Sequence, residues 1–404
     1  MQQTQEKALD VASIQKALKA ENFDGWLFYY FHDNDPLAHH ILGLSADHFV
    51  SRRWFYFIPV SGEPVKLVHR IEMEALDLLP GRKVVYLGWR QLEEKLKELL
   101  GGKGRVAMQY SPNNAIPYIS RVDGGTIELV RSTGVEVVSS ANLVQTFEAV
   151  WSESQLKAHL VAATNLRAIV FDAFKEIATH ITANKPVNEY EIQQFICQRF
   201  EELGMTTNSP PIVAVNEHSG SPHYQPTVTK HSPIKKGDFV LLDIWAKLKQ
   251  PADAVYADIT WTGFVGGKVP EQYEHIFKIV SGARDAAVAF IRKALSEKRV
   301  IHGWEVDDVT RAFITEREHG DDFVHRTGHS IGLEVHANGA NIDNLETRDE
   351  RRLIPRTCFS IEPGVYLAEF GVRSEIDVYI NESEAIIGGE PIQTEVIPIL
   401  SMKH

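Results

Sequence analysis

Four acidic residues interrupt segments that otherwise have the apolar pattern of buried β-strands. Asp243 lies in FVLLDIWA, Asp258 lies in VYADITWTG, Glu362 follows CFSI, and Glu375 lies in VRSEIDVYI. A buried carboxylate without a partner is costly, so each of these residues needs a cation, a network of donors or a metal ion. Taken singly, each fits a solvated strand end or a salt bridge as well as it fits a metal site.

Three histidines, His325, His329 and His336, fall within VHRTGHSIGLEVHANG, residues 324–339. Histidine is a common metal ligand but also an ordinary polar residue. The four carboxylates and the His329 imidazole together favour a pair of divalent cations of hard or borderline character. Carboxylates can bridge two such ions about 3.5–4 Å apart, and such a site hydrolyses amides or phosphoesters. The sequence contains no convincing serine or cysteine nucleophile motif, and no cationic partner for the carboxylates is evident.

Length and composition limit the other classes of function. A chain of 404 residues is too long for one ordinary core, so two domains are expected. The formal net charge of −12 argues against nucleic acid or an anionic membrane as the main partner. The two cysteines, Cys197 and Cys358, exclude a disulfide framework and a thiolate zinc site, and they suit a reducing compartment.

The N-terminal segment, MQQTQEKALDVASIQKALKAENFDG, lacks the basic start and apolar run of a secretory signal. Val11, Ile14 and Leu18 instead form the stripe of a short amphipathic helix. No apolar run approaches the roughly 18 residues that a membrane span needs. We therefore expect a cytoplasmic protein that binds neither membranes nor nucleic acid.

The first domain, expected over residues 1–150, alternates strand-like and helix-like segments. Strands are expected at GWLFYY, WFYFIPV, VKLVH, KVVYLG and RVAMQY, and a helix at RQLEEKLKELL. This pattern predicts an α/β domain with a mixed sheet and helices on its faces. The segment has no phosphate-binding glycine loop and no nucleophile elbow, so we expect a structural or oligomerisation role.

The second domain, expected over residues 151–404, groups its helices and strands separately, which is typical of an α+β fold. Ser152 and Gln155 form a predicted capping box. Helical spacing follows over residues 166–177, and further helices are expected over residues 189–203 and at EQYEHIFKIVSGARDAAVAFIRKAL. Strands are expected at PIVAV, DFVLLDI, TCFSIEPGVYL, EIDVYI and EAIIGG.

The acidic residues and His329, taken in order, resemble the ligand set of the pita-bread metallopeptidases, which include methionine aminopeptidase, Xaa-Pro aminopeptidase and prolidase. The resemblance runs through LLDIW, ADITWTG, TGHSIGLEVH, SIEPGVY and VRSEIDVYI. The first half of the chain is similar to the smaller α/β domain of the proline-specific branch. The resemblance therefore implies a C-terminal pita-bread catalytic domain preceded by a creatinase/prolidase N-terminal-like domain.

The same resemblance implies a role for each predicted metal ligand. Asp243 is expected to chelate one metal ion, while Asp258 and Glu375 bridge both ions. His329 and Glu362 are expected to complete the second metal, and Glu362 also takes the proton of the bridging water.

Other residues match substrate contacts of the family. His223, in SPHYQP, matches a histidine near the scissile bond, and His336 matches one that contacts the substrate and the tetrahedral intermediate. Arg373 matches the arginine that precedes the last glutamate, and it is a candidate to bind the carboxylate of a dipeptide. His325 matches no ligand, so a structural place near the site is expected for it.

The interval between Asp243 and Asp258 departs from the family pattern because of the insertion KLKQPADA. This insertion makes Asp253 an alternative second ligand, although ADITWT fits the family motif and ADAVY does not. In addition, Trp245 stands where the family usually has glycine, and Trp261 stands where it usually has arginine.

The resemblance implies a dinuclear metal-dependent exopeptidase that acts on small peptides with proline at the second position. Proline calls for a dedicated enzyme because its imide lacks an N–H and constrains the chain. We expect an Xaa-Pro dipeptidase (prolidase), with Xaa-Pro aminopeptidase as the alternative. A metal-independent creatinase-like hydrolase and a non-catalytic binding protein are less favoured, because all five ligands are present. Carboxylate-rich ligation favours Mn2+, with Co2+ or Zn2+ able to substitute.

The resemblance also implies a homodimer in which the N-terminal domain of one subunit borders the active site of the other. Residues of FHDNDPLAHHILG and SRRWFYF are candidates to line such an entrance. The aromatic run WFYF is explained better as part of a core strand.

Overall fold

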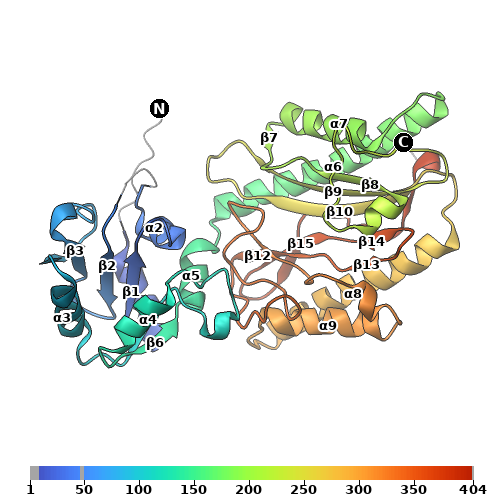
Figure 1. The fold of residues 1–404 in the computed structure, drawn as a ribbon. Helices are drawn as coiled ribbons and strands as arrows, with labels where there is room; N and C mark the ends of the chain where they lie inside the picture. Colours follow the sequence, from blue (N-terminus) through green and yellow to red (C-terminus); the bar gives the residue numbers. More distant parts are fainter. Residues whose placement is uncertain (1–8, 46–49, 403–404) are drawn as a thin grey trace. The chain divides into compact units, whose positions relative to one another are not determined.

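The computed structural model describes residues 9–45 and 50–402. The chain divides into two compact units, Met1–Glu148 and Ala149–His404, and each is described by itself (Figure 1). Within the described ranges, no helix is both long enough and apolar enough to cross a membrane. The N-terminal segment, which is expected to lack a secretory signal, begins with residues 1–8, and these lie outside the described residues.

A six-stranded sheet in the order β4-β3-β2-β1-β5-β6 forms the centre of the first unit. Strand β2 pairs antiparallel with β1 and with β3, whereas the pairs β3–β4, β1–β5 and β5–β6 are parallel. The predicted mixed sheet is therefore confirmed, and β6 is a strand that the sequence analysis missed. The strands are β1 (Gly25–Tyr30), β2 (Trp54–Pro59), β3 (Val65–His69), β4 (Arg82–Tyr86), β5 (Arg105–Met108) and β6 (Glu136–Ser139). The helices are α1 (Val11–Ala20), α2 (Pro36–Leu42), α3 (Trp89–Leu100), α4 (Gly124–Arg131) and α5 (Ala141–Glu148).

Side chains of β1 and β2 alternate between two hydrophobic clusters, one on each face of this sheet. Trp26 and Tyr56 pack in a cluster with residues of α1, α2 and α5, whereas Leu27 and Phe57 pack with residues of α3 and α4. Because helices cover both faces, the strands have continuous apolar sequences instead of alternating ones. All four residues of WFYF are buried in this core.

Long helices cover the strands of the second unit. They are α6 (Glu153–Thr182), α7 (Glu189–Glu202), α8 (Glu271–Ser296) and α9 (Gly303–Thr315). The predicted capping box of α6 is present, since Ser152 Oγ accepts from the Gln155 N–H at 3.1 Å and Gln155 Oε1 accepts from the Ser152 N–H at 2.8 Å. The sequence analysis did not predict α9, which begins at its own capping box of His302 and Glu305.

The strands of the second unit form separate sheets between the helices. One sheet has the order β17-β10-β9-β7, with β8 also paired to β9; a second has the order β11-β12-β15-β16, and β13 pairs with β14. The strands are β7 (Met205–Thr206), β8 (Ile212–Val215), β9 (Phe239–Leu248), β10 (Ala257–Phe264), β11 (Ser330–Ile331), β12 (Thr357–Ile361), β13 (Gly364–Tyr366), β14 (Gly371–Arg373), β15 (Ile376–Ile380), β16 (Ala385–Ile387) and β17 (Ile397–Pro398). Helices α6 and α7 cover the first sheet, and α8 and α9 lie beyond β12 and β15 (Figure 1). This layered α+β unit confirms the predicted fold class.

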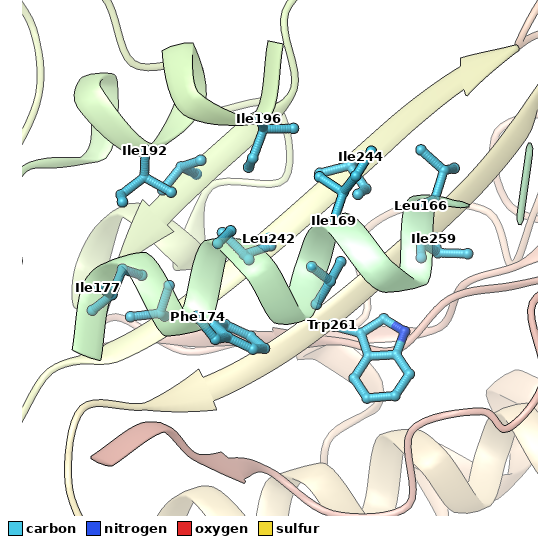
Figure 2. Close-up of a cluster of buried hydrophobic side chains, with 14 of the residues drawn as sticks. Leu166, Ile169, Phe174, Ile177, Ile192, Ile196, Leu242, Ile244, Ile259 and Trp261 are labelled. Carbon is cyan, nitrogen blue, oxygen red and sulfur yellow. The ribbon is translucent and has the colours of Figure 1, made fainter. Parts of the chain in front are cut away.

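The two long strands β9 and β10 separate an apolar face from a polar one. Leu242, Ile244, Ile259 and Trp261 point toward α6 and α7 and pack against their apolar side chains (Figure 2). Trp261 meets the Phe171 ring edge-on, with the ring centroids 5.2 Å apart. Because side chains alternate along a strand, the residues between these positions face the opposite side, where the aspartates lie.

The predicted continuous strand TCFSIEPGVYL is interrupted in the structure. Strand β12 ends at Ile361 and β13 begins at Gly364, so Glu362 and Pro363 lie between the two strands. Pro363 has no N–H to donate to a ladder, and the N–H of Glu362 donates instead to the Thr327 carbonyl at 2.8 Å. The break turns the chain where Glu362 enters the candidate site.

Candidate metal centre and active site

The predicted site residues line one cavity in the second unit, with a volume of about 430 Å³. Its walls come from β8, β9, β10 and β14 and from the segments between strands and helices, including those directly after β12 and before β15. A cavity of this size is within the usual range for a small-molecule site. The predicted residues that line it are His223, Asp243, Asp258, His329, His336, Glu362, Arg373 and Glu375.

Strand register brings the two aspartates to the same face. Thr260 lies opposite Asp243 and Trp245 lies opposite Asp258 in the antiparallel β9–β10 pair, so the aspartates are diagonal neighbours. Asp253, the alternative ligand, lies in the connection between the two strands, where it is exposed and does not line the cavity. The structure thus brings Asp258, and not Asp253, into the cavity.

Asp258, His329 and Glu375 are all buried, and each offers one ligand atom within 4.8 Å of those of the other two. His329 Nε2 lies 3.7 Å from Asp258 Oδ2 and 3.3 Å from Glu362 Oε1. Its Nδ1 lies 3.3 Å from the Ser330 carbonyl oxygen, which leaves Nε2 directed at the carboxylates. Asp258 Oδ1 is buried and accepts no hydrogen bond from the described residues. An acceptor in that position fits a bound cation.

The electrostatics of the cluster favour the same conclusion. Burial, reinforced by the neighbouring carboxylates, raises the pKa of Asp258 and of Glu375 well above their ordinary values. Burial also raises the pKa of Glu362 to about 7, against the opposing effect of Arg373. Burial lowers the pKa of His329 well below its usual value, so its ring is a neutral donor of a lone pair. A divalent cation would offset this crowding of negative charge.

Arg373 supplies a counter-charge that the sequence analysis missed. Its guanidinium forms a buried ion pair with Asp243, and its Nε donates to Thr260 Oγ1 at 3.1 Å. Thr260 Oγ1 in turn donates to Glu375 Oε2 at 2.7 Å. The expectation that the carboxylates lack a cationic partner was therefore wrong for Asp243, because β14 brings Arg373 to it across 130 residues of sequence.

His325 belongs to a hydrogen-bond chain that begins at Arg373. Arg373 Nη1 donates to the Tyr366 hydroxyl at 3.0 Å, and that hydroxyl lies 2.6 Å from His325 Nε2. His325 Nδ1 lies 2.6 Å from the Arg326 carbonyl, to which it must donate, so Nε2 is the acceptor of a neutral ring. Burial and Arg373 lower the pKa of His325 to about 3, in agreement with a neutral ring. His325 thus orients its neighbours and is not placed as a metal ligand.

His223 and His336 line the cavity but keep exposed surface, in contrast to the buried His329. The His336 ring lies edge-on to the His329 ring, with the centroids 4.2 Å apart. His223 lies in the segment between η3 (Asn216–Gly220) and β9. This separation places one histidine among the carboxylates and two at the open part of the cavity.

Supporting residues were missed at the sequence level because their roles depend on distant contacts. Ser360 Oγ accepts from the His329 N–H at 2.9 Å and lies 3.0 Å from Glu362 Oε1. Asp377 Oδ2 accepts from the Asp258 N–H at 2.9 Å. Thr260, which also supports the cluster, had a signal in the sequence, since it lies two residues after Asp258 on the same face of one strand.

The sequence profile of metallopeptidase family M24 matches residues 158–382. A putative Xaa-Pro aminopeptidase from Mycoplasma pneumoniae is 32% identical over 202 residues, 50% of this chain and 52% of that protein. The Xaa-Pro dipeptidase from Pyrococcus furiosus is 33% identical over 175 residues, 43% of this chain and 45% of that protein. The chain thus matches about half of the length of these two curated relatives.

The fold is also similar to solved structures. The dipeptidase PepE from Mycobacterium ulcerans superposes with a TM-score of 0.63 at 21% identity, covering 97% of this chain and 100% of that one. The match of the family profile spans more than half of the chain and includes every predicted metal ligand. The chain belongs to metallopeptidase family M24.

Proposed function

We propose that this protein is a dinuclear metal-dependent exopeptidase that cleaves the Xaa-Pro bond of small peptides, and dipeptides in particular. The observation that carries the proposal is a cluster of four carboxylates, three of them buried, with the buried His329 in one cavity. The names of the relatives, Xaa-Pro dipeptidase and putative Xaa-Pro aminopeptidase, support the proline specificity.

Five residues are proposed to hold two divalent cations. Asp243 belongs to one ion, His329 and Glu362 to the other, and Asp258 and Glu375 to both. The oxygen-rich set favours Mn2+, with Co2+ or Zn2+ as substitutes. When bound, the ions supply Lewis acidity toward the substrate carbonyl and lower the pKa of a water nucleophile.

Side chains of the cavity are proposed to carry out the proton transfer and to orient the substrate. Glu362, held by Ser360 and close to His329, is proposed to accept the proton of the attacking water. His336, at the open part of the cavity, is proposed to donate to the oxygen on which charge develops. His223 is proposed to orient the scissile bond. The leaving proline nitrogen must gain a proton to depart as a secondary amine, and Glu362 can return to it the proton taken from the water.

A cavity of about 430 Å³ suits a short substrate. The carboxylate of a dipeptide would meet two guanidinium groups there, those of Arg373 and Arg326. Arg373 is the proposed carboxylate ligand, although its contacts with Asp243 and Tyr366 hold it in place. Cleavage of longer Xaa-Pro peptides is the second candidate function, supported by the aminopeptidase relative. A metal-independent creatinase-like reaction does not need the carboxylate cluster, so the presence of the cluster argues against it.

The first prediction tests metal dependence and substrate length together. Chelation should abolish cleavage of Ala-Pro, and Mn2+ should restore it, because the carboxylate cluster needs cations to act on the substrate carbonyl. Restored enzyme should cleave Ala-Pro faster than Ala-Pro-Ala, measured as kcat/KM by the release of proline or of Pro-Ala. Full activity after exhaustive removal of metal would disprove the metallopeptidase mechanism, and a preference for Ala-Pro-Ala would favour the aminopeptidase.

The second prediction separates the histidines. His329→Ala should lower the metal content, whereas His223→Ala and His336→Ala should retain two ions and lose turnover by about 10²–10⁴-fold. Metal analysis and steady-state rates on the three variants provide the measurement. Loss of metal from His336→Ala, with full metal content in His329→Ala, would reverse the proposed roles.

The third prediction concerns Thr260, whose hydroxyl links Arg373 to Glu375. Thr260→Val should weaken metal binding by about 10–100-fold, because a residue that orients a metal ligand is lost. Titration calorimetry with Mn2+ provides the measurement. Thr262→Val is the matched control, since Thr262 lies on the same face of β10 and is equally buried but pairs with Gln393. Equal effects of the two changes would argue against a specific link to the metal site.

The fourth prediction concerns assembly. We propose that the N-terminal unit mediates a homodimer and borders the active site of the partner subunit. Support comes from apolar side chains that this unit leaves exposed, including Ile71, Leu87 and Trp89. Sedimentation velocity at assay concentration should give a dimer, and activity should fall on dilution to monomer. A fully active monomer would contradict this proposal.

A further inference from the structure

The segment that carries His223 has little regular structure of its own. Residues 215–232 run from the end of β8 through η3 and a series of turns. Pro222, His223 and Gln225, all in this segment, line the cavity. A backbone without a sheet or helix ladder needs other contacts to keep such side chains in place.

One buried carboxylate supplies these contacts. Glu189, the first residue of α7, is fully buried. Its Oε1 accepts from the Val215 N–H at 2.8 Å and lies 2.9 Å from His218 Nδ1. Its Oε2 accepts from the Tyr224 hydroxyl at 2.7 Å and from the Ser232 N–H at 2.6 Å. A single side chain therefore holds both ends of the segment and two points between them.

The chemistry of these contacts makes the anchor strong. A carboxylate only accepts hydrogen bonds, so His218 Nδ1 must carry a hydrogen and donate. Hydrogen bonds to an ionised acceptor are shorter and stronger than neutral ones. Negative charge is also favoured at the N-terminal end of a helix, where Glu189 lies. The Glu189 N–H donates back to the Ser232 carbonyl at 3.1 Å, which closes the attachment at that end.

The anchor reaches His223 through its sequence neighbour Tyr224. The Tyr224 and His218 rings stack with their centroids 4.1 Å apart and their planes inclined by 25°. Tyr224 is buried against Ile212 and Leu241 of the sheet, whereas His223 faces the cavity. Fixing the Tyr224 ring therefore fixes the backbone from which the His223 side chain projects.

A second attachment joins the same segment to the strand that carries Arg373. Ser219 Oγ accepts from the Gly371 N–H at 2.9 Å, and Gly371 begins β14, which ends at Arg373. The segment is thus held on one side by α7 and on the other by an element of the metal centre. A change at Glu189 would release the α7 side alone.

We propose that Glu189, acting through His218 and Tyr224, is a positioning residue that sets the place of His223 for catalysis. The inference rests on the proposed function, since it takes His223 as the group that orients the scissile bond. Glu189 is not among the described residues that line the cavity, so it acts through its neighbours. The geometry of a reacting pair is sensitive, and a misplacement of about 1 Å can cost on the order of 10²-fold in rate.

The test compares Glu189→Gln with Glu191→Gln. Glu191 lies on the same helix but is exposed, and among the described residues its hydrogen bonds are those of the α7 capping box, so its change leaves the segment untouched. Glu189→Gln should lower kcat by about 10–100-fold with little change in KM or metal content. Glu191→Gln should keep the parent values. Tyr224→Phe, which keeps the ring and removes one bond, should lower kcat by about fivefold and serves if Glu189→Gln does not fold.

A double-mutant cycle distinguishes positioning from general support of the fold. In the His223→Ala background, Glu189→Gln should have no further effect on kcat, because the group it positions is already gone. An equal loss of kcat in both backgrounds, or full activity of Glu189→Gln, would overturn the proposal. The same cycle with Tyr224→Phe should give the same pattern.

Hydrogen–deuterium exchange gives a readout that does not depend on activity. Amides of residues 216–231 should exchange faster in Glu189→Gln than in Glu191→Gln, with β9 and β10 unchanged. Unchanged exchange in this segment would overturn the proposal. If the parent protein cleaves no Xaa-Pro peptide, the proposed substrate fails, and the exchange result alone decides whether Glu189 holds the segment.

Discussion

The second unit is organised around a concentration of negative charge in a buried place. Asp243, Asp258 and Glu375 are at most 8% exposed, and Glu362 lies beside them. Isolated ions in such surroundings are strongly destabilised, so the charge must be neutralised by protons, by arginine or by metal ions. Arg373 provides part of the compensation through its ion pair with Asp243. The pKa values of Asp258 and Glu375 are still raised, which indicates that the positive charge of Arg373 does not neutralise the whole cluster.

The fold meets this constraint by keeping the polar cluster on the inner faces of its strands. Strands β9 and β10 bury their other face under α6 and α7, and β12 and β15 pack against α8 (Figure 1). The helices thereby stabilise strands whose inner faces are too polar to form a core. Of the proposed metal ligands, Asp243 and Asp258 lie on strands β9 and β10, and the other three directly adjoin a strand: His329 precedes β11, Glu362 follows β12, and Glu375 precedes β15. The histidines proposed to contact substrate lie outside the strands, and the segment that carries His223 is attached to a buried glutamate of α7.

Much of this arrangement could be predicted because it follows local rules. Because side chains alternate along a strand, Asp258 and Ile259 face opposite sides of the sheet. The order of the acidic residues and His329 along the chain indicated a metal site. The contacts of Arg373, Tyr366 and His325 could not be predicted, because Arg373 pairs with a residue 130 positions earlier in the chain. The hold of Glu189 on Ser232 spans 43 residues and leaves no periodic signal. The break after β12 did have a signal in the sequence, because Pro363 cannot donate to a ladder and a Pro-Gly pair is typical of a turn.

Anomalous diffraction from crystals grown with Mn2+ tests the central claim most directly, because it locates the ions without reference to activity. The account predicts two anomalous peaks in the cavity, both in contact with carboxylate oxygens of Asp258 and Glu375, and one of them with His329 Nε2. Crystals that bind Mn2+ elsewhere, or that show no peak among these residues at saturating Mn2+, would contradict it.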